Sequence, residues 1–163
     1  MNEDVHACTD PKHHVHDAKG FVAAVERACT SRGLRLTPIR AYVLSLVAHA
    51  GKPLKAYDLL EMVRTGDGPG AAAPPTVYRA LDFLLENGFI HKLESINAFV
   101  ACHHPSSSRH SVPFLICDTC QSATELEDAE IVDLLDARAR GLGFAPRAQI
   151  LEVHGTCAQC LAA

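Results

Sequence analysis

The sequence has no run of about 18 apolar residues, the length that a helix needs to cross a membrane. Residues 1–17 are polar, charged and rich in histidine, so they do not resemble a secretion signal. No Gly-rich phosphate loop and no H-E-x-x-H or G-x-S-x-G motif is present, which argues against the enzymes that depend on them. These absences predict a cytoplasmic protein without a membrane partner, in a reducing compartment where disulfides are unfavoured.

The two halves of the chain differ in charge. The 163 residues carry a formal net charge of -4 and are 48% hydrophobic, enough for a core in one large domain or two small ones. Residues 20–102 contain nine Lys/Arg against seven Asp/Glu, a net of +2, whereas residues 103–163 contain four against eight, a net of -4. This asymmetry suggests different partners for the two halves and permits DNA binding by the first.

Two C-x-x-C pairs carry the strongest chemical signal: Cys117 with Cys120, and Cys157 with Cys160. Four thiolates surround Zn²⁺ tetrahedrally in structural zinc sites, and each pair supplies two of them from one tight turn. Disulfides and a thioredoxin-like redox motif are the alternatives. A redox C-x-x-C stands alone in a βαβ context, so the matched pairs favour structural zinc.

Residues 20–102 show the pattern of a winged helix. Residues 1–19 before them have no apolar periodicity and are expected to be disordered; their four histidines and Cys8 either bind metal loosely or are simply solvated. Apolar stripes and breakers predict helices over 21–33, 37–51, 56–64 and 76–88. Strands over 89–95 and 98–102 then flank Ile96-Asn97 as a hairpin. In a winged helix, the last helix before the wing enters the major groove.

The remaining residues predict a small α/β unit. Pro105 and three serines mark residues 103–111 as a hinge. A strand is expected at 112–116, a second at Leu126, a helix over 128–141 and a strand over 148–154. About 50 residues form an insecure core alone. We therefore expect zinc and dimerisation to stabilise this unit, which spans residues 112–163.

A second metal site is predicted at the hinge. If the hairpin turns symmetrically about Ile96-Asn97, His91 and Cys102 lie directly opposite each other on one face. His110 follows in the hinge and Glu125 comes soon after Cys120, which completes a mixed N/S/O set that zinc accepts. Taken singly, each residue favours a plainer explanation: an exposed wing histidine, a buried thiol, a loop histidine or a surface acid. An ion held by wing, hinge and second unit would fix the angle between the two halves.

Several long motifs resemble the Fur (ferric uptake regulator) family, and most closely its zinc uptake regulators: residues 36–40 (LTPIR), 56–60 (AYDLL), 74–84 (PPTVYRALDFL) and 88–92 (GFIHK). The resemblance covers residues 21–160. It implies an α+β fold, with an N-terminal winged-helix DNA-binding domain and a C-terminal α/β dimerisation domain. It also implies a homodimeric repressor of zinc-uptake genes that binds A/T-rich palindromic operators with Zn²⁺ as corepressor.

The resemblance also assigns the metal ligands, with about two zinc ions per subunit. Cys117, Cys120, Cys157 and Cys160 would be structural, and His91, Cys102, His110 and Glu125 regulatory. Iron-sensing members usually carry His-His-x-His before the first C-x-x-C, where this chain has residues 111–114 (SVPF). Many members also place a histidine eight residues before the third cysteine, where this chain has Gln149. Both departures argue against a further, hard-metal site.

Helix 76–87 is the expected recognition helix. Arg79 lies in its first turns, away from Val77 and Leu81, and an arginine can bind guanine O6 and N7 through two hydrogen bonds. Without the motif, Arg79 would be interpreted as a solvated surface charge. Thr76 and Tyr78 are placed for phosphate or methyl contacts, and the resemblance adds Tyr57 from the preceding helix.

Three other functions compete with zinc-dependent repression. A regulator of the same family could sense iron or manganese. A zinc metalloenzyme could use His91, Cys102 and His110 as ligands and Glu125 as general base, but four protein ligands leave no open coordination position. A metal-trafficking or thiol-redox protein could use the tail, but that function leaves the winged-helix pattern unexplained.

Overall fold

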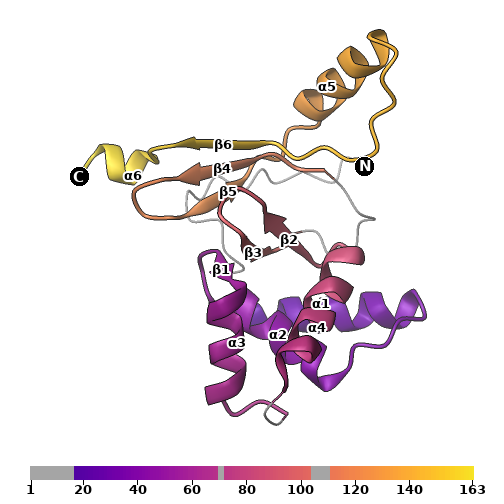
Figure 1. Ribbon diagram of the computed structural model, residues 1–163, viewed down its shortest axis with the longest axis vertical. Helices are drawn as coiled ribbons and strands as arrows, with labels where there is room; N and C mark the ends of the chain where they lie inside the picture. The colour runs from indigo at the N-terminus through magenta and orange to yellow at the C-terminus, as the bar shows by residue number, and fades with distance from the viewer. Residues whose placement is uncertain (1–16, 70–71, 104–110) are drawn as a thin grey trace, which may run out of the picture. The chain divides into compact units, whose positions relative to one another are not determined.

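The computed structural model describes residues 17–69, 72–103 and 111–163, which fall into two compact units on either side of Ser111 (Figure 1). The first unit is mainly helical and the second is built on a small sheet. Among the described residues, no helix is both long and apolar enough to cross a membrane.

Four helices form the body of the first unit: α1 (Ala18–Ser31), α2 (Pro38–His49), α3 (Ala56–Thr65) and α4 (Pro74–Glu86). Each follows a local signal. The Asp17 side chain caps α1 by accepting a 2.9 Å hydrogen bond from the Gly20 N–H, and prolines stand at the first position of α2 and of α4. The four predicted helices are therefore present, although α4 begins at Pro74, two residues earlier than expected.

A three-stranded antiparallel sheet completes the first unit, in the order β1-β3-β2. Strands β2 (Ile90–Leu93) and β3 (Ala98–Ala101) are the predicted hairpin, while β1 (Leu54–Lys55) was not predicted. Helices and strands share one core, which includes Val43, Leu44, Leu59, Leu81, Leu84 and Phe89. This arrangement is a winged helix.

The predicted register of the hairpin is wrong. His91 pairs with Val100, and Cys102 follows β3 and donates its backbone N–H to the Phe89 carbonyl at 3.0 Å. The connection between the strands is longer than a two-residue turn, and Asn97 adopts a left-handed φ of 48° at its end. The two-residue slip preserves side-chain parity, because residues i and i+2 of a strand share a face. His91 and Cys102 are therefore diagonal neighbours on one face and not a direct pair.

The second unit has a sheet in the order β5-β4-β6. Strand β4 (Phe114–Cys117) pairs antiparallel with β5 (Ala123–Glu125) and parallel with β6 (Glu152–Gly155). Helix α5 (Ala129–Gly141) supplies the crossover that a parallel pair requires, and the short α6 (Ala158–Leu161) follows β6. Asp128 caps α5 as predicted, accepting from Glu130 N–H at 3.0 Å. Leu126 lies just after β5 and not within it, and β6 begins later than predicted.

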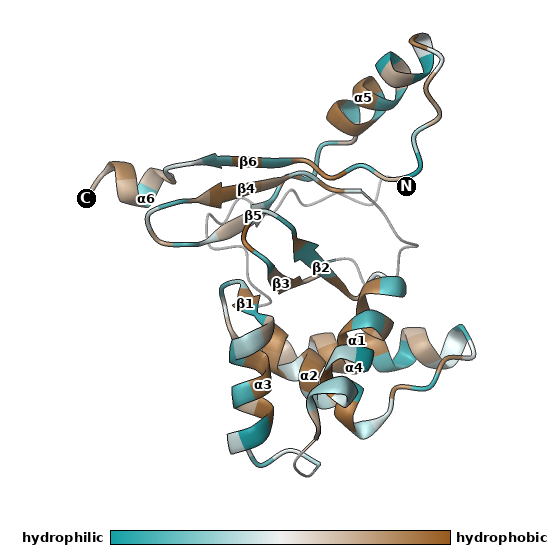
Figure 2. Ribbon diagram, in the orientation of Figure 1, coloured by the Kyte–Doolittle hydropathy of each residue, from teal (hydrophilic) through white to brown (hydrophobic). Residues whose placement is uncertain are grey.

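Apolar side chains of the second unit remain exposed in the single chain. Figure 2 shows apolar residues along β4 and in α6. Helix α5 buries none of its residues, and Leu134, Phe144, Ile150 and Val153 each keep half or more of their area exposed. This unit therefore does not complete a core by itself, as its small size predicted.

Candidate metal centre and nucleic-acid interface

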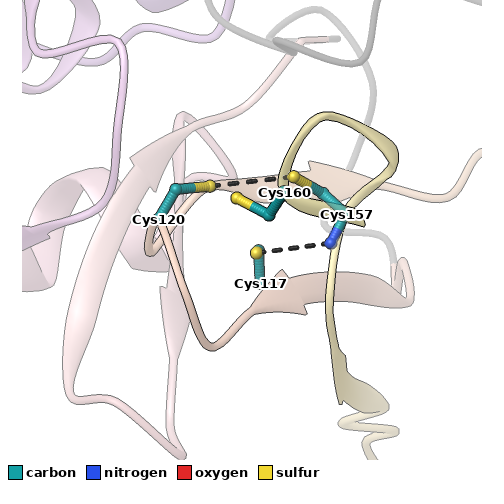
Figure 3. Close-up of side chains that lie close together, drawn as sticks. All are labelled: Cys117, Cys120, Cys157 and Cys160. Carbon is teal, nitrogen blue, oxygen red and sulfur yellow. Dashed lines mark hydrogen bonds between the residues drawn. The ribbon is translucent and has the colours of Figure 1, made fainter. Parts of the chain in front are cut away.

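The sheet of the second unit brings the two C-x-x-C pairs together. Cys117 ends β4, and Cys120 lies in the turn toward β5. Cys157 is the N-cap of α6, and Cys160 lies within that helix. Parallel pairing places Cys117 beside Gly155, so the first cysteine pair meets the segment that leads into the second (Figure 3).

Backbone hydrogen bonds hold the first cysteine turn in place. The Gln121 N–H donates to the Cys117 carbonyl at 2.9 Å, and Gln121 itself adopts a left-handed φ of 61°. The Asp118 N–H donates to the Gly155 carbonyl at 2.8 Å, which ties the turn to β6. The turn is thus fixed by main-chain contacts before any metal is considered.

The sulfur positions fit a tetrahedral zinc site. The four Sγ atoms all lie within 4.8 Å of one another, and Sγ of Cys120 is 3.8 Å from Sγ of Cys157. A regular tetrahedron with Zn–S bonds of about 2.3 Å has S···S edges of about 3.8 Å. The Cys157 N–H also donates to Sγ of Cys117 at 3.3 Å, so this backbone dipole faces a ligand sulfur (Figure 3). The four thiols predicted to bind zinc therefore form one compact cluster with suitable chemistry.

Local hydrogen bonds divide the thiols by acidity. Backbone N–H groups of Cys120 and Cys157 lower the pKa of the Cys117 thiol to about 6. The hydroxyl of Ser122, whose Oγ is 3.1 Å from Sγ of Cys120, lowers the pKa of Cys120. Cys160 shows the opposite effect, because its hydrogen bond with Cys157 and its burial raise its pKa to about 12. Several adjacent thiolates are stable only with a cation among them, which is the role of zinc in such a site.

A side-chain contact beside the cluster was not predicted from the sequence. His154 Nδ1 of β6 lies 2.9 Å from Oδ1 of Asp118, the residue that follows Cys117. The contact joins the first cysteine turn to the strand that leads toward Cys157. No local sequence signal identifies it, because the two residues are 36 positions apart.

The second predicted ligand set is divided between the two units. Cys102 is fully buried in the first unit, where His91 Nε2 is also buried. Glu125, in the second unit, is only 4% exposed, unusual for a carboxylate. His110 lies outside the described residues. The direct pairing that first suggested this site is wrong, but His91 and Cys102 still share one face of the wing.

Residues that depart from the iron-sensing pattern surround one small cavity in the second unit. Ser111, Val112 and Gln149 line it together with Pro113, Val132 and Leu151. The Gln149 Nε2 donates to the Val132 carbonyl at 3.4 Å and so joins the segment before β6 to α5. Amide, hydroxyl and apolar groups line this cavity without a histidine, cysteine or carboxylate.

The predicted DNA-contact residues lie on exposed faces of α3 and α4. Helix α4 buries Val77, Leu81 and Leu84 and exposes Tyr78 and Arg79, while Thr76 is half-buried. Tyr57, in the first turn of α3, is 77% exposed, a large value for an aromatic side chain. Tyr57, Tyr78 and Arg79 are therefore accessible to a ligand, and their contact with nucleic acid stays a prediction.

A winged helix followed in the same chain by a small α/β unit with four clustered cysteines defines a two-unit protein with a DNA-binding fold and a thiolate metal site. The chain belongs to the ferric uptake regulator family, whose family model matches residues 31–154.

Individual relatives extend this similarity over most of the chain. The zinc uptake regulation protein of Escherichia coli K12 is 43% identical over 141 residues, covering 86% of this chain and 81% of its own. The crystal structure of holo XcZur is 70% identical with a TM-score of 0.83, covering 88% of this chain and 99% of that one. A zinc uptake regulator complexed with zinc and DNA is 42% identical, also with a TM-score of 0.83, covering 89% and 95%.

Proposed function

We propose that this protein is a zinc-responsive transcriptional repressor that binds palindromic operators of zinc-uptake genes, with Zn²⁺ as corepressor. The observation that carries the proposal is the similarity, over 89% of the chain, to a zinc uptake regulator complexed with zinc and DNA. The four-cysteine cluster and the winged helix supply the two chemical capacities that this function needs.

Residues 20–102 would bind DNA, residues 103–111 would act as a hinge, and residues 112–163 would hold metal and dimerise. Helix α4 would enter the major groove, with Arg79 at a base edge, Thr76 and Tyr78 at phosphates or methyl groups, and Tyr57 contributing from α3. The protein would act in the cytoplasm, where its DNA target would lie.

Each subunit would hold about two zinc ions. Cys117, Cys120, Cys157 and Cys160 would form the structural site, for which the sulfur spacing gives direct support. His91, Cys102, His110 and Glu125 would form the regulatory site. The burial of Cys102 and Glu125 supports this site, because a buried thiolate or carboxylate needs a cation or hydrogen bonds to keep its charge.

Two features favour zinc over iron or manganese as the sensed metal. A thiolate such as Cys102 disfavours hard, oxygen-preferring ions. The cavity around Ser111, Val112 and Gln149 has none of the groups that hold such ions. An enzymatic role for the second ion is disfavoured because four protein ligands leave no open position for a substrate.

A homodimer would cover the apolar surface of the second unit. Leu115 and Val153 pair across β4 and β6 and line a hollow of about 410 Å³. Leu134 and Leu135 on α5 are exposed as well. Exposed apolar surface of this kind marks an interaction site.

Zinc-dependent operator binding is the decisive test. Fluorescence anisotropy of a labelled palindromic operator would be followed with zinc-loaded protein and with protein treated with a chelator that spares the four-cysteine zinc. A random duplex of equal length serves as the control. We expect tight operator binding only with zinc, and sedimentation as a dimer both with and without it. Operator binding that is unchanged by zinc would overturn the proposal.

A further inference from the structure

Two arginines of the first unit lie against aromatic rings. The guanidinium carbon of Arg40, on α2, is 3.7 Å from the ring centroid of Phe83, on α4. Arg40 also donates from Nη1 to the Arg35 carbonyl at 2.7 Å. One side chain thus joins α4, α2 and the connection between α1 and α2.

The second arginine repeats this arrangement at the end of α4. Arg32, the C-cap residue of α1, lies 5.3 Å from the ring centroid of Phe89 and donates from Nη1 to the Asn87 carbonyl at 3.0 Å. Asn87 is the C-cap of α4, where carbonyl groups lack helical partners and a cation is favoured.

The two contacts form one continuous ladder. The rings of Phe83 and Phe89 are 6.3 Å apart with planes tilted by 49°, within the range of favourable aromatic pairs. We call Arg32, Phe89, Phe83 and Arg40 the arginine–phenylalanine ladder. It runs from the α1 C-terminus past the C-terminal half of α4 to α2, and none of its four residues is a predicted DNA contact.

The chemistry of the ladder depends on shape more than on charge. A guanidinium is planar and stacks on a ring while keeping its N–H groups free for carbonyls in the same plane. A lysine keeps the positive charge but cannot make both contacts at once. Each arginine here is held by a ring and a backbone carbonyl, so its geometry is fixed on two sides.

We propose that Arg40 and Arg32 are positioning residues for DNA recognition, which set the orientation of α4 through the ladder and do not act as phosphate contacts. This inference rests on the proposed function, in which α4 reads the operator. A helix that enters the major groove must place its side chains at the base edges within the narrow range of distances and angles that a hydrogen bond allows. A small rotation of α4 would therefore lower affinity for the operator more than affinity for random DNA.

The test compares Arg40→Lys, Arg40→Gln, Phe83→Leu and the double variant Arg40→Lys/Phe83→Leu with wild type. Arg27→Lys and Arg27→Gln, at an exposed arginine of α1, are the matched controls. Affinities for operator and random duplex are measured by anisotropy with zinc present, at several salt concentrations. The hydrogen-exchange rate of α4 amides without DNA independently measures how firmly the ladder holds this helix. Arg32→Lys tests the other end of the ladder.

We expect Arg40→Lys to lose this stacking and therefore to bind the operator more weakly, on the order of tenfold. Its affinity for random duplex and its salt slope should be unchanged. We expect Arg40→Gln to match Arg40→Lys, the double variant to be no worse than the poorer single variant, and α4 to exchange faster in all of them.

Three results would overturn the inference: a Lys variant with wild-type affinity, a salt slope that falls by about one in Arg40→Gln, or additive losses in the double variant. Wild-type protein that fails to bind the operator with zinc would instead overturn the proposed function itself.

Discussion

Sγ of Cys120 lies 3.8 Å from Sγ of Cys157, although 37 positions separate the two residues in sequence. One sulfur comes from the turn after β4 and the other from the N-cap of α6. Two thiolates at this distance repel each other unless a cation lies between them. Closure of this part of the second unit is therefore linked to metal binding.

Loss of a cluster thiol and loss of a wing thiol should have different effects. We expect Cys117→Ser to lower zinc content, thermal stability and dimerisation together, because binding free energy at a structural zinc site is folding free energy. Cys102→Ala removes one buried sulfur from a core that is otherwise intact, at a cost of roughly 1 kcal/mol. It should leave a folded dimer whose operator binding no longer responds to zinc.

Three measurements on both variants check this: zinc per subunit, sedimentation, and operator affinity with and without added zinc. Equal losses of stability and dimerisation in the two variants would show that the sites have no separate roles.

Proton release on zinc binding should report the uneven acidity of the cluster. The Cys117 pKa of about 6 means that this thiol is already ionised near neutral pH, whereas the Cys160 pKa of about 12 keeps its proton. Zinc displaces only the protons that remain, so we expect fewer than four per ion, and affinity that rises with pH. A pH indicator added to weakly buffered, zinc-stripped protein measures the number of protons released per zinc ion bound. Release of four protons would mean that the empty cluster is unfolded and its thiols are unperturbed.

Much of the fold follows from local signals. Thr37-Pro38 starts α2, Asp128 caps α5, and apolar stripes mark the buried faces of α3 and α4. Strand β1 escaped prediction because its two residues are too few to show a period; it exists through pairing of Leu54 with Phe99. The hairpin register failed because Ile96-Asn97 resembles a two-residue turn, whereas the structure uses a longer loop that ends in left-handed Asn97.

The candidate site also has one part that the sequence predicts and another that only the tertiary fold shows. The C-x-x-C spacing predicts the cysteine cluster because both thiols of each pair come from one turn. The contact of Asp118 with His154 and the stacking of Arg40 on Phe83 could not be predicted, since each joins side chains that only the tertiary fold brings together.

A side chain added at Gly68 should destabilise the first unit. A Cβ at Gly68 would overlap the ring of Tyr42, and one at Gly66 would overlap its hydroxyl and lie 2.7 Å from the Met62 carbonyl. We expect Gly68→Ala to lower the free energy of unfolding by about 1–3 kcal/mol. Gly141→Ala is a control for a Cβ that meets nothing within 4 Å, and as the last residue of α5 it should be neutral or slightly stabilising. Chemical denaturation followed by circular dichroism compares them; equal stabilities would show that the loop moves away from Tyr42 at no cost.

Arg79→Ala should remove sequence selectivity and leave zinc content unchanged. Arg79 is exposed on α4 opposite buried Val77 and Leu81, so its loss leaves the core intact. An arginine at a guanine edge contributes about 1–3 kcal/mol of discrimination. Competition binding with operator and random duplex measures the difference, with Arg27→Ala as control. Uniform weakening on both duplexes would identify Arg79 as a phosphate contact.

Metal choice is the most discriminating prediction. Ligand type, more than affinity alone, separates metals in a cell, and Cys102 would supply a thiolate that hard ions disfavour. We expect Zn²⁺ to restore operator binding to protein that is stripped at the second site but retains the four-cysteine zinc. Fe²⁺ and Mn²⁺ at cellular concentrations should not restore it. Both imidazoles and the thiol must be deprotonated to bind, so the response should weaken as pH falls through the histidine range.

Anaerobic titration of labelled operator with each metal measures this response, and the Cys102→Ala variant serves as the control that lacks the thiolate. Wild-type protein should respond to Zn²⁺ at far lower concentrations than to Fe²⁺, and the variant should respond to neither metal, because its second site has lost the thiolate ligand. Activation of the wild type by Fe²⁺ at or below the concentration needed for Zn²⁺ would identify an iron regulator. In that case Cys102 would be a buried core residue and not a ligand.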